Sequence, residues 1–244
     1  MNTNKITFTA NKVWLSSESS STPKPIMKTI PSWYRKADRF AKNVSSGDFY
    51  IGPDGGKVPT WKACPAIFDI MGSGYSLNTP CDIEFFKGSN GLEFKIASVK
   101  YSDFIQSRSE MPQFEHPRGY YKNHFAWTCD WQIKLPEGYS ALYSQPFNRF
   151  ELPFFTTSGI VDNDKVNMPG SMPFFICDGF EGIIPAGTPY VQLLPFKREN
   201  WESEIIEQND GSKIMMQSIE NSQIYRKPDG GIYKNEVWEP RKYE

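Results

Sequence analysis

The sequence predicts a mainly β protein built from short strands, with one or two short helices. The 244 residues include 18 Gly and 19 Pro, and these residue types interrupt helices and are typical of turns. Apolar residues recur in short segments of alternating polarity, which is the periodicity of a strand with one buried face. Aromatic residues make up 15% of the chain, enough to fill a large core or a contact between subunits.

The chain divides into three predicted segments: an N-terminal arm and loop-rich extension over 1–60, a β core over 61–200, and a short helix with a C-terminal tail over 201–244. The first segment contains one short strand within 5–15, then a stretch rich in Ser, Thr and Pro. A short helix is expected after Pro31, with Ser32 as a candidate N-cap. The helix near the third segment is predicted over 199–208.

The middle of the chain carries the predicted strands of the core. A short apolar helix is expected over 62–70, and a hairpin is expected from strands over 81–86 and 92–99. The segment 125–135 predicts a single strand that places five apolar side chains on one face. These are Phe125, Trp127, Cys129, Trp131 and Ile133. Further short strands are predicted over 139–143, 152–156, 159–161, 172–177 and 190–196. Residues 101–124 and 43–60 read as loops.

The charge balance argues against several classes of protein. Lys and Arg number 27 and Asp and Glu number 28, for a formal net charge of −1. This argues against a strongly basic nucleic-acid binder and leaves a local basic patch open. The N-terminal residues lack the apolar segment of a secretory signal, and no stretch approaches the length of a membrane span. The expected location is therefore the cytosol or an assembly made there.

The cysteines and histidines do not form a recognisable metal motif. More than fifteen residues separate any two of the cysteines, which are Cys64, Cys81, Cys129 and Cys177. Small buried thiols are the expected role. His116, His124 and Cys129 are close in sequence, but no fourth ligand has suitable spacing. Nucleophile-elbow, zincin, Walker and zinc-deaminase motifs are also absent.

Two acidic residues in one loop are candidates for chemistry. Asp162 and Asp164 lie in the sequence GIVDND, and two such acids can hold a divalent metal or activate a water. The other interpretation is a solvated turn, which is the commoner use of such a pair.

Four segments follow one another in a characteristic order. They are GYSL at 74–77 with CDI at 81–83, PEGY at 136–139 with PFNR at 146–149, GIVDND at 159–164, and PAGTPYVQLL at 185–194. Together they resemble the motifs of the dUTPase and dCTP-deaminase superfamily. The resemblance implies a β-clip fold over about half of the chain.

The same resemblance implies roles for particular residues if the chain is a nucleotide enzyme. Asp162 would position the water or the sugar, Arg149 would contact phosphate, and Gln192 would line the pocket. Asp82 or Asp164 would hold Mg²⁺, the one cofactor implied. These assignments belong to the enzyme alternative alone.

Departures from the motifs weaken that alternative. Ser76 stands where the family has an Asp, Phe147 and Asn148 stand in the phosphate-binding motif, and Lys165 replaces the sugar-stacking Tyr. The glycine-rich C-terminal motif is not recognisable. Since a hydrolase needs bound phosphates and a positioned water together, Asp162 is expected to be structural.

A second resemblance concerns the segments 61–85 and 146–175. They resemble an uncharacterised family of tailed, T4-like phages, and phage head-decoration proteins that form trimers also use the β-clip. This favours a non-enzymatic virion or accessory structural protein, trimeric, without cofactor, located in the virion or the host cytoplasm. Other virion proteins are candidate partners, and no membrane contact is expected.

Aromatic side chains have two interpretations in this hypothesis. A set of six is expected to pack in the core or between subunits: Trp127, Trp131, Phe154, Phe155, Phe174 and Phe175. A carbohydrate- or peptide-binding module is the third alternative, and four exposed aromatics would stack on its ligand. These are Tyr120, Tyr121, Trp201 and Trp238.

Overall fold

A computed structural model describes residues 4–13, 15–53, 55–89, 91–168, 170–207, 209–225 and 233–244. The chain forms two compact units, each discontinuous in sequence. The β unit comprises Met1–Thr29, Gly74–Arg198 and Tyr243–Glu244. The helical unit comprises Ile30–Ser73 and Glu199–Lys242.

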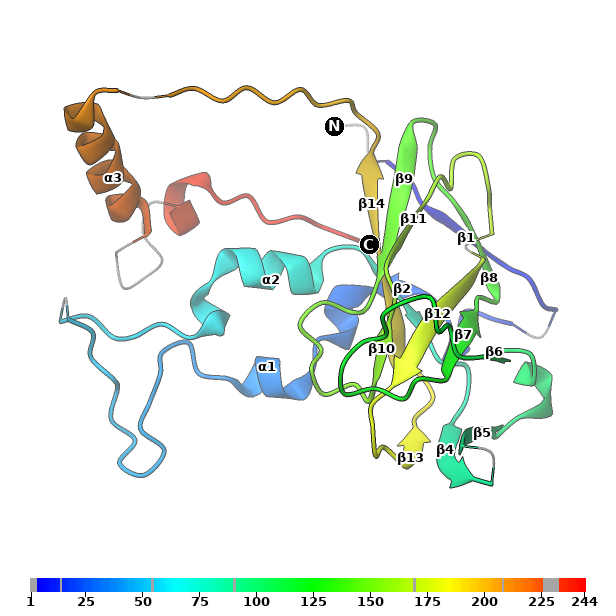
Figure 1. Cartoon of the computed structure of the whole chain (residues 1–244). Coiled ribbons are helices and arrows are strands. Elements are labelled where there is room, and N and C mark those ends of the chain that lie inside the picture. Colours follow the sequence, from blue (N-terminus) through cyan, green and yellow to red (C-terminus); the bar gives the residue numbers. More distant parts are fainter. Residues whose placement is uncertain are drawn as a thin grey trace. The chain divides into compact units, whose positions relative to one another are not determined.

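Antiparallel pairing organises the β unit into four small sheets (Figure 1). Their strand orders are β1-β8, β10-β12-β7-β6, β11-β9-β14-β3-β2 and β13-β4-β5. The strands are β1 (Thr7–Ala10), β2 (Lys24–Pro25), β3 (Tyr75–Asn78), β4 (Ile83–Gly88), β5 (Gly91–Ile96), β6 (Ile105–Arg108), β7 (His124–Thr128), β8 (Trp131–Lys134), β9 (Tyr139–Ser144), β10 (Phe154–Thr156), β11 (Gly159–Val161), β12 (Ser171–Ile176), β13 (Gly182–Ile184) and β14 (Pro189–Lys197). The predicted mainly β class, with short strands and few short helices, is confirmed.

The helical unit contains the three α-helices of the described residues. They are α1 (Ser32–Lys36), α2 (Pro65–Gly72) and α3 (Gly211–Tyr225), with the single turns η2 (Trp61–Ala63) and η4 (Tyr233–Val237). Two further single turns, η1 (Ile26–Thr29) and η3 (Val99–Tyr101), belong to the β unit. A small core joins α1 and α2 through Ile30, Tyr34 and Met71. Among the described residues, no helix combines the length and apolar character needed to cross a membrane.

The β unit is held by a continuous aromatic core. The rings of Trp127 and Phe174 stack with centroids 3.6 Å apart, and Phe154 packs edge-on against Trp127. Trp131 and Phe175 are also buried, and Phe155 is half-buried. Five of the six aromatics predicted to pack are therefore buried within the chain itself, and Phe155 is the exception.

The predicted single strand over 125–135 is wrong in one respect. It is two strands, because β7 pairs with β12 and β6 while β8 pairs with β1. The break falls at Cys129 and Asp130, where the backbone carbonyl of Asp130 accepts from Asn11 N at 2.9 Å. The alternation was read correctly, since all five predicted inward side chains are buried.

The helix predicted over 199–208 is also wrong. Described residues 201–207 form no helix, and α3 begins later, at Gly211. The Asp210 carboxylate accepts from the backbone N–H groups of Ser212 and Lys213, at 3.0 and 3.4 Å, and so caps the helix. The segment 199–207 has four Glu and no Lys or Arg, and like charges three residues apart disfavour a helix. The loop predicted over 101–124 contains the strand β6.

Gly74 permits the close approach of β3 to β14. Its φ is +83°, and a Cβ at this position would lie 2.1 Å from the backbone O of Leu193. Neither the left-handed backbone nor this contact tolerates a side chain. The first motif glycine therefore has a structural role in this fold.

We expect Gly74→Ala to destabilise the chain by more than about 2 kcal/mol, because left-handed strain adds to a backbone clash. Gly138 is the matched control, since its φ is +82° and nothing lies within 4 Å of an added Cβ. Gly138→Ala should cost only the strain, about 1 kcal/mol. Urea unfolding of both variants tests this, and equal losses would contradict the clash.

Candidate functional site

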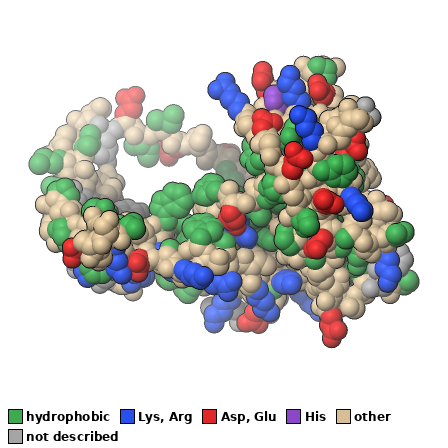
Figure 2. Space-filling model, turned by 90° about the horizontal axis from the view of Figure 1, so that it is seen from below, with side chains coloured by type: hydrophobic (Ala, Val, Ile, Leu, Met, Phe, Trp, Pro, Cys, Tyr) green, Lys and Arg blue, Asp and Glu red, His purple; other side chains and the backbone are tan. Residues whose placement is uncertain are grey.

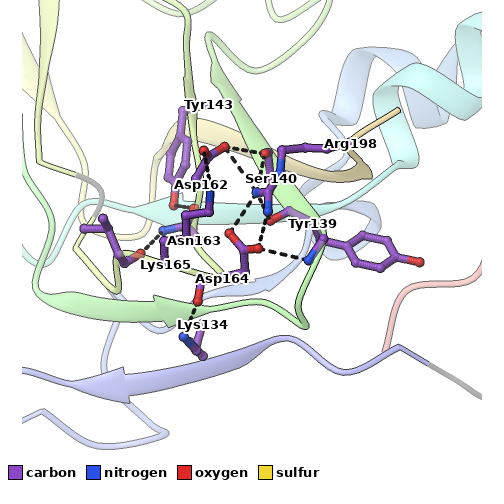
Figure 3. A network of polar contacts seen from close by, with 11 residues as sticks. Lys134, Tyr139, Ser140, Tyr143, Asp162, Asn163, Asp164, Lys165 and Arg198 are labelled. Atoms are coloured by element: carbon purple, nitrogen blue, oxygen red, sulfur yellow. Dashed lines mark hydrogen bonds and ion pairs between the residues drawn. The ribbon is translucent and has the colours of Figure 1, made fainter. Parts of the chain in front are cut away.

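The strand register brings the GIVDND loop beside the ends of two other strands. In the five-stranded sheet β9 lies between β11 and β14, with Val161 opposite Ala141 and Lys197 opposite Tyr139. The residues that follow β11 and β14 therefore meet at one end of β9. This is where Asp162, Asp164 and Arg198 lie with Ser140, as the carboxylate–arginine network (Figure 3).

Asp164 is the most strongly held member of this network. Its Oδ1 accepts from Arg198 Nη1 at 2.7 Å, and its Oδ2 accepts from Arg198 Nη2. The backbone N–H of Gly138 also donates to Oδ2, at 2.9 Å. Only 4% of the Asp164 side chain is exposed. The result is a two-point carboxylate–guanidinium pair with a backbone donor in addition.

Asp162 is more accessible and more loosely held. Its Oδ1 accepts from Ser140 Oγ at 2.6 Å and lies 3.3 Å from Arg198 Nη1. Its Oδ2 lies 3.9 Å from Lys165 Nζ. The side chain is 43% exposed, so Asp162 is the more solvent-accessible of the two carboxylates.

These contacts lower the pKa of both carboxyl groups. For Asp164 the hydrogen bonds from the Arg198 guanidinium are the main cause, and the pKa lies well below its ordinary range. For Asp162 the Ser140 hydroxyl is the main cause, with the charge of Arg198 also contributing. The two acids are thus held as carboxylates, Asp164 mainly by the Arg198 guanidinium and Asp162 mainly by the Ser140 hydroxyl.

Asn163, between the two acids, is buried and fastens the loop from inside. Its Oδ1 accepts from the hydroxyl of Tyr143 at 2.8 Å, and its Nδ2 donates to Val166 O at 3.1 Å. Sequence reasoning did not single out Asn163 or Arg198. The one available signal was the pair of cations, Lys197 and Arg198, that follows the predicted strand over 190–196.

The other predicted residues fasten backbone segments elsewhere in the β unit. Gln192 is buried, and its Oε1 accepts from the backbone N–H of Phe147 at 3.0 Å. Arg149 donates from Nη1 to Thr29 O at 2.9 Å and from Nε to Glu151. The Asp82 carboxylate accepts from Ala186 N at 2.8 Å.

The arrangement of these acids bears on whether they suit Mg²⁺. The guanidinium of Arg198 contacts both carboxylate oxygens of Asp164, and its positive charge opposes a second cation there. The Asp82 carboxylate already accepts a backbone N–H. Within the described part of the chain, no group of three or more His, Cys, Asp or Glu side chains is arranged to hold a metal ion.

Histidines and cysteines play separate parts. The buried ring of His124 stacks on Phe175 with centroids 5.5 Å apart. The Cys129 thiol donates to Trp131 O, and burial raises its pKa to about 12. His116 lines a cavity of about 390 Å³ together with Glu110, Met111, Pro112, Gln113, Phe114, Glu115, Lys122 and Phe175.

Comparison with known proteins finds likenesses among solved structures alone. No protein-family model matches the chain, and no curated protein matches it. Among solved structures, the dUTPase of phage phi11 of S. aureus is similar at 14% sequence identity and a TM-score of 0.27, over 44% of this chain and 98% of that chain. A likeness at this score does not bear on activity, substrate or assembly.

The ion pair predicts how stability depends on pH. Because the pKa of Asp164 is lower in the folded chain than its ordinary 3.8, the unfolded chain takes up this proton first as the pH falls. The stabilising contribution is therefore complete above the ordinary pKa and is lost progressively below it. Asp164→Asn lacks this contribution at every pH.

We expect the difference in free energy of unfolding between wild type and Asp164→Asn to narrow as the pH falls below about 4. Urea unfolding at a series of pH values measures it. Asp38→Asn, which removes a carboxylate whose side chain is 61% exposed, is the control. If the difference in free energy of unfolding between wild type and Asp164→Asn stays constant across this pH range, the stabilising role of the Asp164–Arg198 pair is contradicted.

Proposed function

We propose that the chain is a non-enzymatic structural protein of a phage virion, or accessory to one, that assembles as a trimer. The observation that carries the proposal is that Arg198, the cation of the carboxylate–arginine network, is already engaged by the carboxylates of Asp164 and Asp162. The polar groups of this network bind one another and the ends of β9 and β14, and they hold the loop after β11 in place. A site kept for a ligand needs groups that the ligand can use.

The charged members of the network oppose the binding of a nucleotide phosphate. Arg198 is the cation nearest to both carboxylates, and Asp164 takes both of its terminal nitrogens. A phosphate would have to displace a carboxylate whose side chain is 4% exposed, leaving that carboxylate without its partner. Such a displacement is costly for a buried pair.

Two positions that correspond to the resembled motifs are closed in the sheet. Ser76 on β3 is opposite Gln192 on β14, and both side chains are buried. The side-chain amide oxygen of Gln192, Oε1, already accepts a hydrogen bond from the backbone N–H of Phe147. These positions support packing between strands, in agreement with a scaffold.

A nucleotide enzyme is the second candidate, and one observation favours it. The Asp162 side chain is 43% exposed, and among the described residues the ion-pair partner of its Oδ2 is the Lys165 ammonium, 3.9 Å away. In this alternative Asp162 acts on the water or the sugar, Arg149 and Gln192 contact the substrate, and Asp82 or Asp164 binds Mg²⁺.

A turnover assay separates the two candidates. Purified protein is incubated with dUTP, dCTP and the other deoxynucleotides, with and without Mg²⁺, and pyrophosphate and ammonia are measured. We expect no turnover above background and no difference between wild type and Asp162→Ala. If the wild type turns over a nucleotide and the Asp162→Ala variant is folded but inactive, the non-enzymatic proposal is overturned.

The assembly has its own test. Light scattering on the full chain should give three times the 28.0 kDa mass of one chain, and mass spectrometry should find the protein in purified virions. A monomer at all concentrations would contradict the trimer, while absence from virions would leave only the accessory role.

A further inference from the structure

One continuous stretch of the helical unit exposes apolar side chains without burying any. Every described residue from 199 to 221 is exposed. The exposed fractions are 87% for Trp201, 92% for Ile205 and 75% for Ile206, and 67% for Met215 in α3. An isolated helix of 15 residues, the length of α3, is only marginally stable in water without a packing partner. The exposed apolar residues therefore indicate a surface that another molecule covers.

The first part of this stretch is also strongly acidic. Residues 199–210, the acidic arm, contain Glu199, Glu202, Glu204, Glu207 and Asp210 and no Lys or Arg. Figure 1 shows residues 199–207 of this arm as an extended trace that follows β14. An extended segment as long as the acidic arm reaches up to about 40 Å. Its partner should therefore offer positive charge and apolar contacts over an extended surface.

The same chain carries such a surface in the basic segment, residues 35–62. Six cations stand here against the three acids Asp38, Asp48 and Asp54: Arg35, Lys36, Arg39, Lys42, Lys57 and Lys62. Antiparallel bridges join Phe40 to Pro59, Lys42 to Phe49 and Ile51 to Lys57. No described residue of the basic segment is buried.

Aromatic and cationic groups alternate on this surface. The Lys57 ammonium lies 3.8 Å from the ring centroid of Phe49, and the Lys42 ammonium lies 5.2 Å from it. Tyr50 and Ile51 are 51% and 60% exposed. Figure 2 shows hydrophobic side chains at the surface with Lys and Arg side chains beside them.

We infer that the acidic arm of one copy of this chain docks on the basic segment of a second copy. The acidic arm supplies carboxylates and the side chains of Trp201, Ile205 and Ile206. The basic segment supplies ammonium groups and exposed aromatic rings. The two surfaces are complementary in charge, and both also expose apolar side chains. Charge complementarity favours the correct register and rapid association.

A contact of this kind also fits the assembly proposed above, on which the inference rests. It joins two different surfaces of identical chains, so it is a head-to-tail contact, which forms a closed ring when the rotation between copies closes. Each copy in a ring of three gives one acidic arm and receives one. No surface of this pair is then left uncovered.

Charge reversal tests the contact on the full chain. One variant carries Glu202→Lys, Glu204→Lys and Glu207→Lys in the acidic arm, and another carries Lys42→Glu and Lys57→Glu in the basic segment. We expect each to weaken self-association by at least about tenfold in analytical ultracentrifugation. The chain that carries all five changes should regain association, because attraction is restored with both signs exchanged.

A matched control separates the contact from general charge effects. Lys95→Glu with Lys100→Glu makes the same charge change as Lys42→Glu with Lys57→Glu, but at exposed positions of the β unit. Self-association of this control should remain as in wild type. Thermal unfolding of each variant verifies that it folds. Association of the wild type should also weaken as salt is raised.

The outcomes distinguish this inference from the proposed function. A trimer that neither reversal disturbs would overturn the arm contact and leave the trimer proposal standing. A wild-type chain that is monomeric at all concentrations would overturn both. Binding of a single-stranded oligonucleotide that Lys42→Glu with Lys57→Glu abolishes, without any effect on self-association, would instead assign the basic segment to nucleic acid.

Discussion

The pair between Asp164 and Arg198 joins three parts of the β unit that are distant in sequence. Arg198 follows β14, Asp164 follows β11, and the backbone N–H of Gly138 at the start of β9 completes the contact. A two-point carboxylate–guanidinium pair has a defined geometry as well as a favourable energy. The loop after β11 consequently has one position relative to the sheet, and Asn163 is carried inward to meet Tyr143.

The aromatic core supplies the second constraint. Trp127, Phe174 and Phe154 come from β7, β12 and β10, which are neighbours in one sheet. The indole N–H of Trp127 donates to Thr156 Oγ1 at 3.1 Å, so the only polar atom of that buried side chain has a partner. Many of the aromatic side chains are thus buried within the chain itself. Large apolar side chains remain exposed on both units, among them Phe114, Phe150 and Ile160 of the β unit and Trp201, Ile205 and Met215 of the helical unit.

These features together are the basis of the proposed non-enzymatic role. The side chains that resemble catalytic positions bind neighbouring strands and loops. The acidic arm and the basic segment contain no buried described residue, and they are opposite in charge. The proposed assembly needs a well-packed core and complementary surfaces, which the aromatic core and these two segments would supply.

The amino-acid sequence by itself determined the fold class and most strand positions. Turn residues and period-2 alternation are local properties, so the hairpin of β4 and β5 and the inward face of β7 and β8 could be predicted from them. The break at Cys129 and Asp130 and the start of α3 at Gly211 could not. The first depends on which strands pair, and the second on the Asp210 carboxylate, which caps α3 after the acidic segment 199–207.

The candidate site was only half visible in the sequence. Asp162 and Asp164 stood out because two acids share one loop, whereas Arg198 is more than thirty residues further along the chain. Only the order β11-β9-β14 brings that guanidinium to the two carboxylates. Strand order is set by long-range packing and register, which no local pattern encodes. Tertiary structure therefore decided that Asp164 is held in a buried ion pair with Arg198, whereas the side chain of Asp162 stays 43% exposed.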